Sequence, residues 1–204
     1  MSQFTELVAL LRQHVQEPVL NAPASPLEVA GALMTDIPAL QELRDAYIVG
    51  NGQTENYLIG NGESDICHPA APVAVDEVQL FGDFFFMNTE GLRDNYNLYS
   101  ELLANGDLGE CEATSHPPGA VKHVPFSKGW IPFAEGDEEY LCVDLTPGPA
   151  GCVGQVILFA GDVDHLFKVA DSFEEFCGFM ITLYKSGEMH RQGLYKFLCA
   201  RAGL

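Results

Sequence analysis

The sequence predicts an α+β fold of one domain, in which helices precede and follow a mainly antiparallel sheet. Residues 140–145 alternate two sets of side chains, the period-two pattern of a strand with two different faces. Residues 155–160 are almost wholly apolar, which is typical of a central strand covered on both faces. The Pro- and Gly-rich stretch 146–151 cannot continue a strand, so we expect it to join the two in a hairpin longer than two residues.

Two capping patterns in the sequence predict the starts of helices. Ser25, Pro26 and Glu28 provide a cap residue, a proline at the first helical position and a glutamate three residues after the cap. Ser172 is followed by two acidic side chains, which the positive end of a helix dipole favours. Further helices are expected over 2–15, from 37–38 through Tyr47, from a cap at Thr89 to 105, and over 188–201.

The remaining stretches predict strands and loops. Residues 78–87 are strongly apolar and aromatic, so we expect a buried strand with a bulge at Gly82. Two Asn-Gly turns, at 51–52 and 61–62, bracket an apolar triplet at 57–59 that predicts a short strand. Residues 63–75 and 108–123 are expected to be loops.

Composition excludes several classes of protein. The chain has 204 residues, enough for one sizeable core, and no apolar run is long enough to cross a membrane. No basic segment precedes an apolar one at the N-terminus, so we expect no secretory signal. The six cysteines form no zinc-ligand spacing, which favours reduced thiols in the cytoplasm, although Cys142 and Cys152 flank one hairpin and leave a disulfide open.

The charge is the most informative property of the composition. With 29 acidic and 10 basic side chains, the formal net charge is −19. Such a charge opposes binding to nucleic acid or to an anionic membrane and steers encounter with a basic protein. Simple solubility is an equally weighted interpretation of the same charge.

No pattern of catalytic or metal-binding residues emerges. His116 and His123 lie near Cys111 and Glu112, but their spacing does not preorganise metal ligands. The run 162–165 has the residue types that open a calcium loop, without its glycine and closing glutamate. Adjacent carboxylates at 137–139 point in different directions and are expected in an exposed turn. The sequence therefore predicts no enzyme, no cofactor and no metal.

Six motif positions occur in a recognisable order within residues 25–183: Trp130, Pro132, Asp144, Gly154, Ser172 and Phe173. This order resembles the SUKH superfamily, which joins a fungal cell-wall-synthesis regulator to many bacterial immunity proteins of polymorphic toxin systems. The Asn-Gly turn at 51–52 also resembles the turn that follows the family's first helices. We expect Trp130 in the core and Asp144 as an acceptor of turn backbone N–H groups.

The resemblance implies a curved sheet that binds another protein without chemistry of its own. Three segments are expected: an N-terminal helix and linker (1–24), the SUKH-like domain (25–183) and a C-terminal helical extension packed on it (184–204).

The favoured hypothesis is an immunity protein that occludes a basic toxin directed at nucleic acid or nucleotides. The first alternative is a regulator or scaffold that binds a host protein, and the second is an enzyme or small-ligand protein. The oligomeric state stays open. Charge and exposure suggest a contact surface of Glu135, Asp137, Glu138, Glu139, Asp162 and Asp164.

Overall fold

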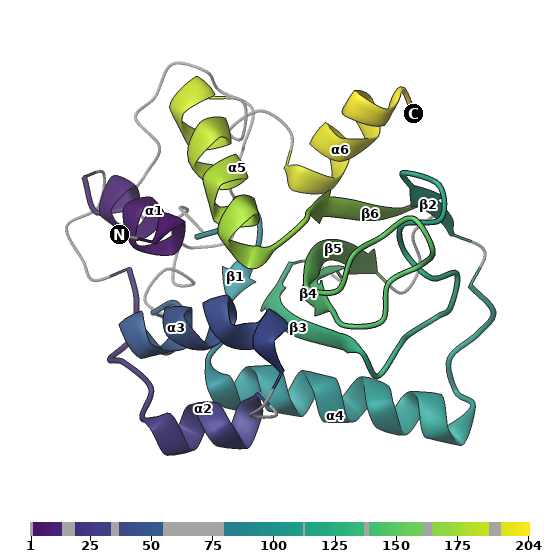
Figure 1. The fold of residues 1–204 in the computed structure, drawn as a ribbon, viewed down its shortest axis with the longest axis horizontal. Helices are drawn as coiled ribbons and strands as arrows, with labels where there is room; N and C mark the ends of the chain where they lie inside the picture. Colours follow the sequence, from purple (N-terminus) through teal and green to yellow (C-terminus); the bar gives the residue numbers. More distant parts are fainter. Residues whose placement is uncertain are drawn as a thin grey trace, which may run out of the picture.

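The structure is a computed structural model that describes residues 2–13, 19–33, 37–54, 80–111, 113–136, 139–160, 165–187 and 193–204. An open sheet forms the centre of the protein. Within these residues, the six strands lie in the order β1-β3-β4-β5-β6-β2 (Figure 1). Every pair is antiparallel except β2 and β6, which are parallel. The strands are β1 (Phe85–Phe86), β2 (Thr114–His116), β3 (Trp130–Glu135), β4 (Glu139–Asp144), β5 (Gln155–Ala160) and β6 (His165–Ala170).

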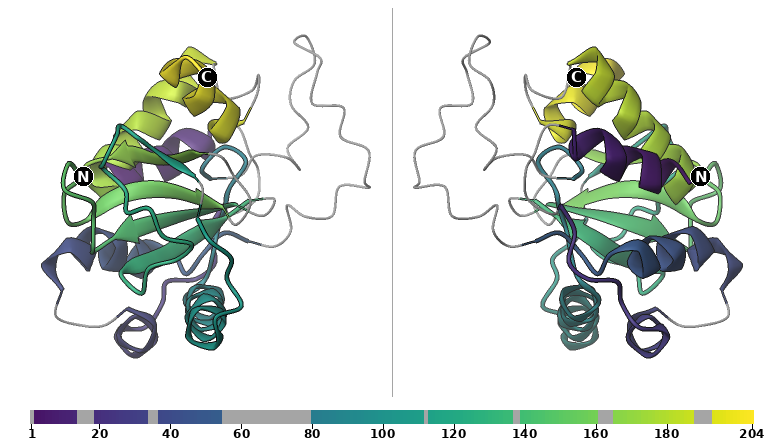
Figure 2. Two further views of the ribbon diagram at one scale, coloured as in Figure 1. Left: turned by 90° about the vertical axis from the view of Figure 1, so that its right-hand side faces the viewer. Right: turned by 90° about the vertical axis from the view of Figure 1, so that its left-hand side faces the viewer.

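Helices cover both faces of this sheet. Helices α1, α5 and α6 lie on one side, and α2 and α4 lie on the other (Figure 2). Helix α3 contacts α1, α2 and α5 and so closes the edge near β1. The helices are α1 (Gln3–Leu11), α2 (Pro26–Ala32), the short 3-10 helix η1 (Pro38–Leu40), α3 (Gln41–Val49), α4 (Thr89–Asn105), α5 (Phe173–Ser186) and α6 (Leu194–Ala202). The expected α+β class with a mainly antiparallel sheet is confirmed.

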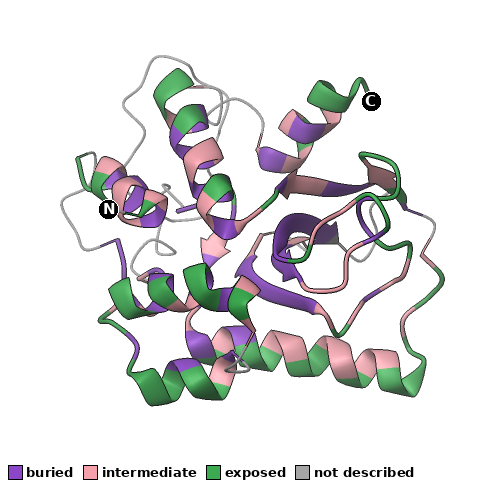
Figure 3. Cartoon of the chain, in the orientation of Figure 1, coloured by how far each residue is buried: buried purple, intermediate pink, exposed green. Residues whose placement is uncertain are grey.

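The alternation in β4 separates two apolar clusters. Leu141 and Val143 belong to the larger cluster, which the residues of α1, α3, α5 and α6 complete. Cys142 belongs to the smaller cluster, together with Trp130 and aromatic side chains packed from α4. Both clusters are buried, and the exposed residues lie on the outer faces of the helices and in the loops (Figure 3). The two-faced strand and the doubly covered strand that the sequence predicted are therefore present.

The predicted helix starts are confirmed with one shift. Ser25 and Glu28 form a complete capping box at α2, and the Ser172 side chain accepts a hydrogen bond from the Glu175 backbone N–H at α5. The prediction of Thr89 as a cap is wrong by one residue, because Asn88 caps α4 by accepting from the Gly91 N–H at 2.7 Å. Asparagine is at least as good an N-cap as threonine, so the helix begins at the earlier residue.

Two predictions need correction. Of residues 80–87, the described part of the expected strand 78–87, only Phe85 and Phe86 form a strand, and residues 80–84 turn back so that Phe81 bridges to Phe84. The expected loop 108–123 contains β2. Strands β3 and β6 were not predicted from the sequence. The predicted strand at 57–59 and loop at 63–75 lie outside the described residues.

The terminal helices contribute to the main core. Phe4 and Leu7 of α1 and Leu194 and Leu198 of α6 are buried in the larger cluster. A hydrogen bond fixes the start of helix α6, because the Leu194 backbone N–H donates to Asp83 Oδ1 at 3.0 Å. The three-segment division at 1–24, 25–183 and 184–204 stays a prediction.

A buried hydroxyl in this core gives a stability prediction. Tyr47 is fully buried and stacks on Phe86 at 4.9 Å, but its hydroxyl has no hydrogen-bond partner among the described residues. A buried polar group without a partner costs free energy. We expect Tyr47→Phe to raise the free energy of unfolding by about 1 kcal/mol in urea titrations.

Tyr96 supplies the control for this measurement, because its hydroxyl donates to the Lys128 carbonyl at 3.0 Å. Tyr96→Phe should lower the free energy of unfolding by up to about 1 kcal/mol. If both variants lost stability equally, the Tyr47 hydroxyl would have to be satisfied in solution.

Candidate functional site

The acidic surface predicted from the sequence begins at one end of the sheet. Glu135 ends β3 and Glu139 begins β4, with Glu135 paired to Tyr140. Glu139 pairs with Ala160, the last residue of β5. The β3–β4 and β5–β6 connections therefore leave the sheet from the same end, which we call the turn end.

Two of the six predicted contact residues are described at the turn end. Glu135 is partly buried, and its carboxylate lies 3.4 Å from the amide nitrogen of Asn95 on α4. Glu139 is partly buried as well, and its carbonyl accepts a hydrogen bond from the Gly136 N–H at 2.8 Å. The other four, Asp137, Glu138, Asp162 and Asp164, lie outside the described residues.

Aromatic side chains lie beside Glu135, which pairs with Tyr140. Tyr140 packs edge-on against Tyr99 of α4, with ring centroids 5.3 Å apart. Burial raises the pKa of the Tyr140 phenol, and the negative charge of Glu135 adds to this, while a hydrogen bond with Tyr99 lowers it. The turn end thus combines acidic groups with a partly buried aromatic pair.

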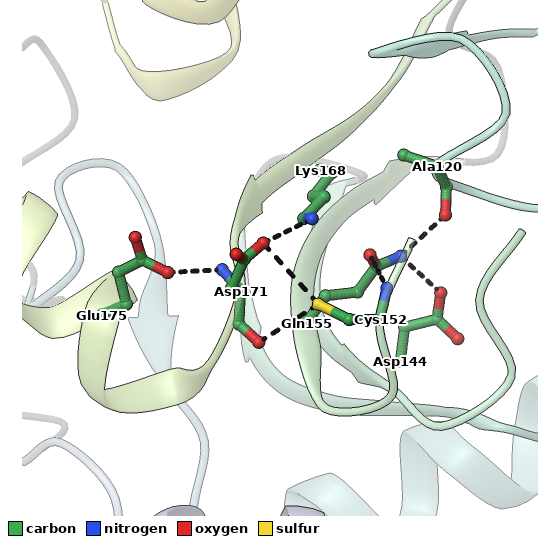
Figure 4. A network of polar contacts seen from close by, with 7 residues as sticks. All are labelled: Ala120, Asp144, Cys152, Gln155, Lys168, Asp171 and Glu175. Carbon is green, nitrogen blue, oxygen red and sulfur yellow. Dashed lines mark hydrogen bonds and ion pairs between the residues drawn. The ribbon is translucent and has the colours of Figure 1, made fainter. Parts of the chain in front are cut away.

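The opposite end of the sheet holds a buried polar network. Asp144 and Gln155 face each other as the ends of β4 and β5, and both are fully buried. Gln155 Nε2 donates to Asp144 Oδ2 and to the Ala120 carbonyl, both at 2.9 Å (Figure 4). Gln155 Oε1 accepts from the Cys152 N–H at 3.0 Å, so the side chain binds three groups of the surrounding loops.

Asp144 fills the role expected from the sequence. Its Oδ1 accepts a hydrogen bond from the Thr146 backbone N–H at 2.8 Å. Burial raises the pKa of the Asp144 carboxyl, against the Thr146 and Gln155 hydrogen bonds and the positive charge of Lys122, which lower it. The network holds the loop between β4 and β5 to the loop around Ala120. The Asp144 and Gln155 side chains are both fully buried, so their hydrogen bonds serve the fold.

The other motif positions also support the fold. Trp130 is fully buried and packs against Phe159 at 5.3 Å. Pro132 lies in β3 at the register shift before Ala134. Gly154 has a φ of +94°, and a Cβ there would lie 3.1 Å from the Cβ of Ala39. Phe173 is buried at the start of α5, where it follows the Ser172 cap.

A second group of carboxylates lies at the start of α5. Glu42 accepts from the Glu174 N–H at 2.9 Å, and Glu174 accepts from the Gln3 N–H at 2.7 Å. Glu175 accepts from the Asp171 N–H at 2.8 Å. These acids bind backbone N–H groups at or beside the starts of α1 and α5. The sequence analysis could not have linked Glu42 to α5, because the two lie far apart in the chain.

An apolar pocket of about 340 Å³ is relevant to the alternative that the chain binds a small ligand. It lies between η1, α4 and β3, and its volume is at the lower end of the range for small-molecule sites. The described lining side chains include no carboxylate, imidazole or thiol, and Tyr96, Lys128 and Thr146 supply its polar groups.

The structure answers two questions that the sequence left open, on the pairing of the cysteines and on the neighbour of His116. Cys142 and Cys152 are free thiols, and burial raises the pKa of both. His116 contacts His165, which comes from another strand, and the sequence analysis had considered His123 as its neighbour. No group of three or more potential metal ligands gathers among the described residues. None of the described helices is long and apolar enough to cross a membrane.

A mainly antiparallel sheet covered by helices on both faces is the architecture that the SUKH resemblance implies. The sequence model of the SMI1 / KNR4 family (SUKH-1) matches residues 41–178, well over half of the chain. The chain therefore belongs to the SMI1/KNR4 family.

Relatives in fungi are named as regulators. The chain is 29% identical over 161 residues to the cell wall biosynthesis/cell cycle regulator smi1 of Schizosaccharomyces pombe, an alignment covering 72% of this chain and 29% of that protein. It is 36% identical over 94 residues to a glucan synthesis regulatory protein of Neurospora crassa, covering 46% and 16%. It is 40% identical over 63 residues to the cell wall assembly regulator SMI1 of Saccharomyces cerevisiae, covering 30% and 12%. The chain thus spans less than a third of these relatives.

Proposed function

We propose that this chain is a non-catalytic protein-binding module that acts through a partner as a regulator or scaffold. The observation that carries the proposal is its membership of a family whose matched fungal relatives are named as regulators of cell-wall assembly or glucan synthesis. The buried polar network of Asp144 and Gln155 supports the same function, because its hydrogen bonds join parts of the fold. The module would contribute a binding surface to a regulatory assembly.

The turn end is the proposed binding surface. Glu135 and Glu139 lie where two chain connections leave the sheet. Glu135 is on the face of Tyr140, next to the Tyr99–Tyr140 pair, and Glu139 faces the other side of β4. The proposed surface also includes Asp137, Glu138, Asp162 and Asp164, whose positions in the sequence put them in those same connections. An aromatic pair surrounded by acidic groups suits a basic partner surface with apolar anchors.

Neutralisation of a basic toxin is the second candidate function. It is favoured by the formal net charge of −19, because a nuclease or nucleotide-directed toxin carries a basic cleft that an acidic protein can occlude. The SUKH superfamily includes immunity proteins of this kind. The two candidates share a binding surface and differ in the partner.

Affinity capture from the native host separates the two functions. The tagged chain is incubated with extract and washed at low and high salt, and bound proteins are identified by mass spectrometry. A partner from cell-wall synthesis or signalling would support the regulator. A single basic partner encoded beside this chain, released by salt, would establish the immunity function and overturn the regulator.

Charge reversal at the turn end tests the proposed surface. We expect the triple variant Asp137→Lys, Glu138→Lys, Glu139→Lys to weaken partner binding at least about tenfold, because like charges across an interface repel. The change should appear mainly in the association rate and should shrink at high salt. Surface plasmon resonance with the captured partner measures both.

A matched variant separates local contact from overall charge. Glu101, Asp107 and Glu110 are exposed on and after α4. Reversing these three acids to lysine changes the net charge by the same amount as the turn-end variant. Equal losses of affinity in the two triple variants would show that net charge alone steers binding and would remove the turn end from the proposal.

A further inference from the structure

Two histidine rings face each other at the β2 edge of the sheet. His116 Nε2 lies 3.2 Å from His165 Nδ1, and the ring centroids are 5.0 Å apart with the ring planes at 69°. His116 ends β2, and His165 begins β6. Both side chains are partly buried, and the His116 ring stacks on Phe167 at 5.3 Å. The pair is therefore held by two paired strands and one aromatic contact.

We propose that His116 and His165 form a two-histidine site for a divalent transition metal ion such as Zn²⁺. Imidazole nitrogen is a favoured ligand of zinc, nickel and copper. Two imidazoles that point at one tetrahedral zinc ion, with Zn–N bonds of about 2.0–2.1 Å, have nitrogens about 3.3 Å apart and ring centroids about 5 Å apart. The observed 3.2 Å and 5.0 Å match both distances.

The comparison of the two distances distinguishes this arrangement from a straight hydrogen bond. If the axes of both rings lay along the line between the nitrogens, 3.2 Å between nitrogens would place the centroids about 5.5 Å apart. The shorter observed separation means that at least one ring axis is tilted away from that line, as both axes are in a pair that shares a metal ion. A metal ion held by the pair would meet a lone pair from each neutral ring.

The strand pairing supplies the preorganisation that the sequence spacing lacks. Parallel pairing sets Thr114 opposite His165 and His116 opposite Phe167, which fixes the backbone of both ligands. A metal ion would bridge β2, the short edge strand, to β6. Because binding to the folded state alone stabilises it, metal should raise the unfolding temperature.

Water would complete the coordination. No third protein ligand joins the pair among the described residues, so two positions of a tetrahedral ion would remain open to solvent. Such a site exchanges its ion readily and binds more weakly than a closed four-ligand site. The formal charge of −19 favours accumulation of cations around the chain.

Calorimetric titration of the untagged chain with zinc chloride tests the site. We expect one binding event that is at least about tenfold weaker in His116→Gln and in His165→Gln. His123→Gln is the matched control, since His123 is exposed in the loop that follows β2 and should bind zinc as the native chain does. Zinc should also raise the unfolding temperature of the native chain by a few degrees and leave that of the two site variants unchanged.

Nitrogen-15 chemical shifts give a readout that does not depend on any variant. On addition of zinc, the ring nitrogens of two histidines should shift together, and the assigned pair should be His116 and His165. No zinc-dependent heat or shift in the native chain would overturn the proposal and leave a hydrogen-bonded pair. Zinc binding that is unchanged in both site variants would also overturn it and would assign the ion to other groups, including the partly exposed thiols of Cys111, Cys152 and Cys199.

Discussion

Replacing Gln155 with leucine is expected to lower the free energy of unfolding by about 3–5 kcal/mol. Leucine fills a similar volume, so the apolar packing around the site changes little. The loss comes from the three hydrogen bonds that Gln155 makes to the carboxylate of Asp144, the carbonyl of Ala120 and the N–H of Cys152. Asp144 and Ala120 would each keep one bond, from the Thr146 N–H and the Gly148 N–H. A hydrogen bond to a charged group contributes about 1.5–3 kcal/mol, and each of the other two contributes about 0.5–1.5 kcal/mol. Urea titrations of the variant and the native chain measure the difference.

The size of this loss should depend on pH through Asp144. Burial raises the pKa of its carboxyl above the ordinary value of 3.8, so ionisation costs the folded state more than the unfolded state. That cost is absent below the ordinary pKa, grows as pH rises from the ordinary pKa to the raised one, and is fully present above the raised pKa. Without the Gln155 donor the folded-state pKa rises further. The variant should therefore be closest to the native chain in acid and furthest from it at neutral pH.

Gln155→Glu provides the isosteric comparison. Glutamate keeps an acceptor for the Cys152 N–H but loses both donors and places a second carboxylate against Asp144. Two adjacent buried carboxylates repel, so this variant should lose stability even more steeply as pH rises. A Gln155→Leu variant as stable as the native chain at neutral pH would mean that water replaces the lost partners and that the network does not hold the loops.

Local patterns in the sequence were sufficient for several elements of the fold. The alternation in residues 140–145 predicted both faces of β4 because a single strand contains that information. The caps at Ser25 and Ser172 were predictable because each involves residues within one helical turn. In each case the interaction that fixes the structure joins close neighbours in the chain.

Elements fixed by distant contacts were missed. Thr114–His116 is too short to show a period, and it becomes a strand only through its pairing with β6. The apolar run at 78–87 predicted one strand because burial alone does not distinguish a strand from a buried turn. In the structure, Phe81 and Phe86 pack edge-on at 5.6 Å, which needs the chain to turn between them.

The residues of the candidate site also fall into two groups, those that local sequence predicts and those whose contacts depend on the register of the strands. Glu135 and Glu139 were predictable as neighbours, because they border one turn. The network of Asp144 and Gln155 depends on the register of β4 with β5, and the histidine pair depends on the register of β2 with β6. A polar residue at the start of the apolar run 155–160 was the only signal of the network in the sequence.

Replacing Gly52 with alanine should be at least as damaging as the loss of the Gln155 side chain, at about 3 kcal/mol or more. Gly52 is buried with a φ of +79°, a conformation that costs alanine about 1–2 kcal/mol. A Cβ there would lie 2.5 Å from the backbone nitrogen of Asn88 and 2.8 Å from the carbonyl carbon of Met87. Backbone atoms cannot move aside as a flexible side chain can.

The surrounding hydrogen bonds explain why the clash cannot be relieved cheaply. Asn51 Oδ1 accepts from the Thr89 N–H at the start of α4, and the Gln53 N–H donates to the Phe86 carbonyl, both at 2.8 Å. Moving the turn away from Asn88 would stretch both bonds, which join the Asn-Gly turn to β1 and α4. The variant should therefore unfold at lower urea and also lose protection of the Thr89 and Gln53 amides from hydrogen exchange.

Gly106 separates the two causes of this loss. It ends α4 with a φ of +76°, and no atom lies within 4 Å of the position that a Cβ would occupy. Gly106→Ala should therefore lower the free energy of unfolding only by what the backbone conformation costs alanine, about 1–2 kcal/mol. The difference between the two variants measures the close approach of the Asn-Gly turn to Asn88. Equal losses would mean that the turn can shift, and that its contact with the start of α4 contributes little to the stability of this fold.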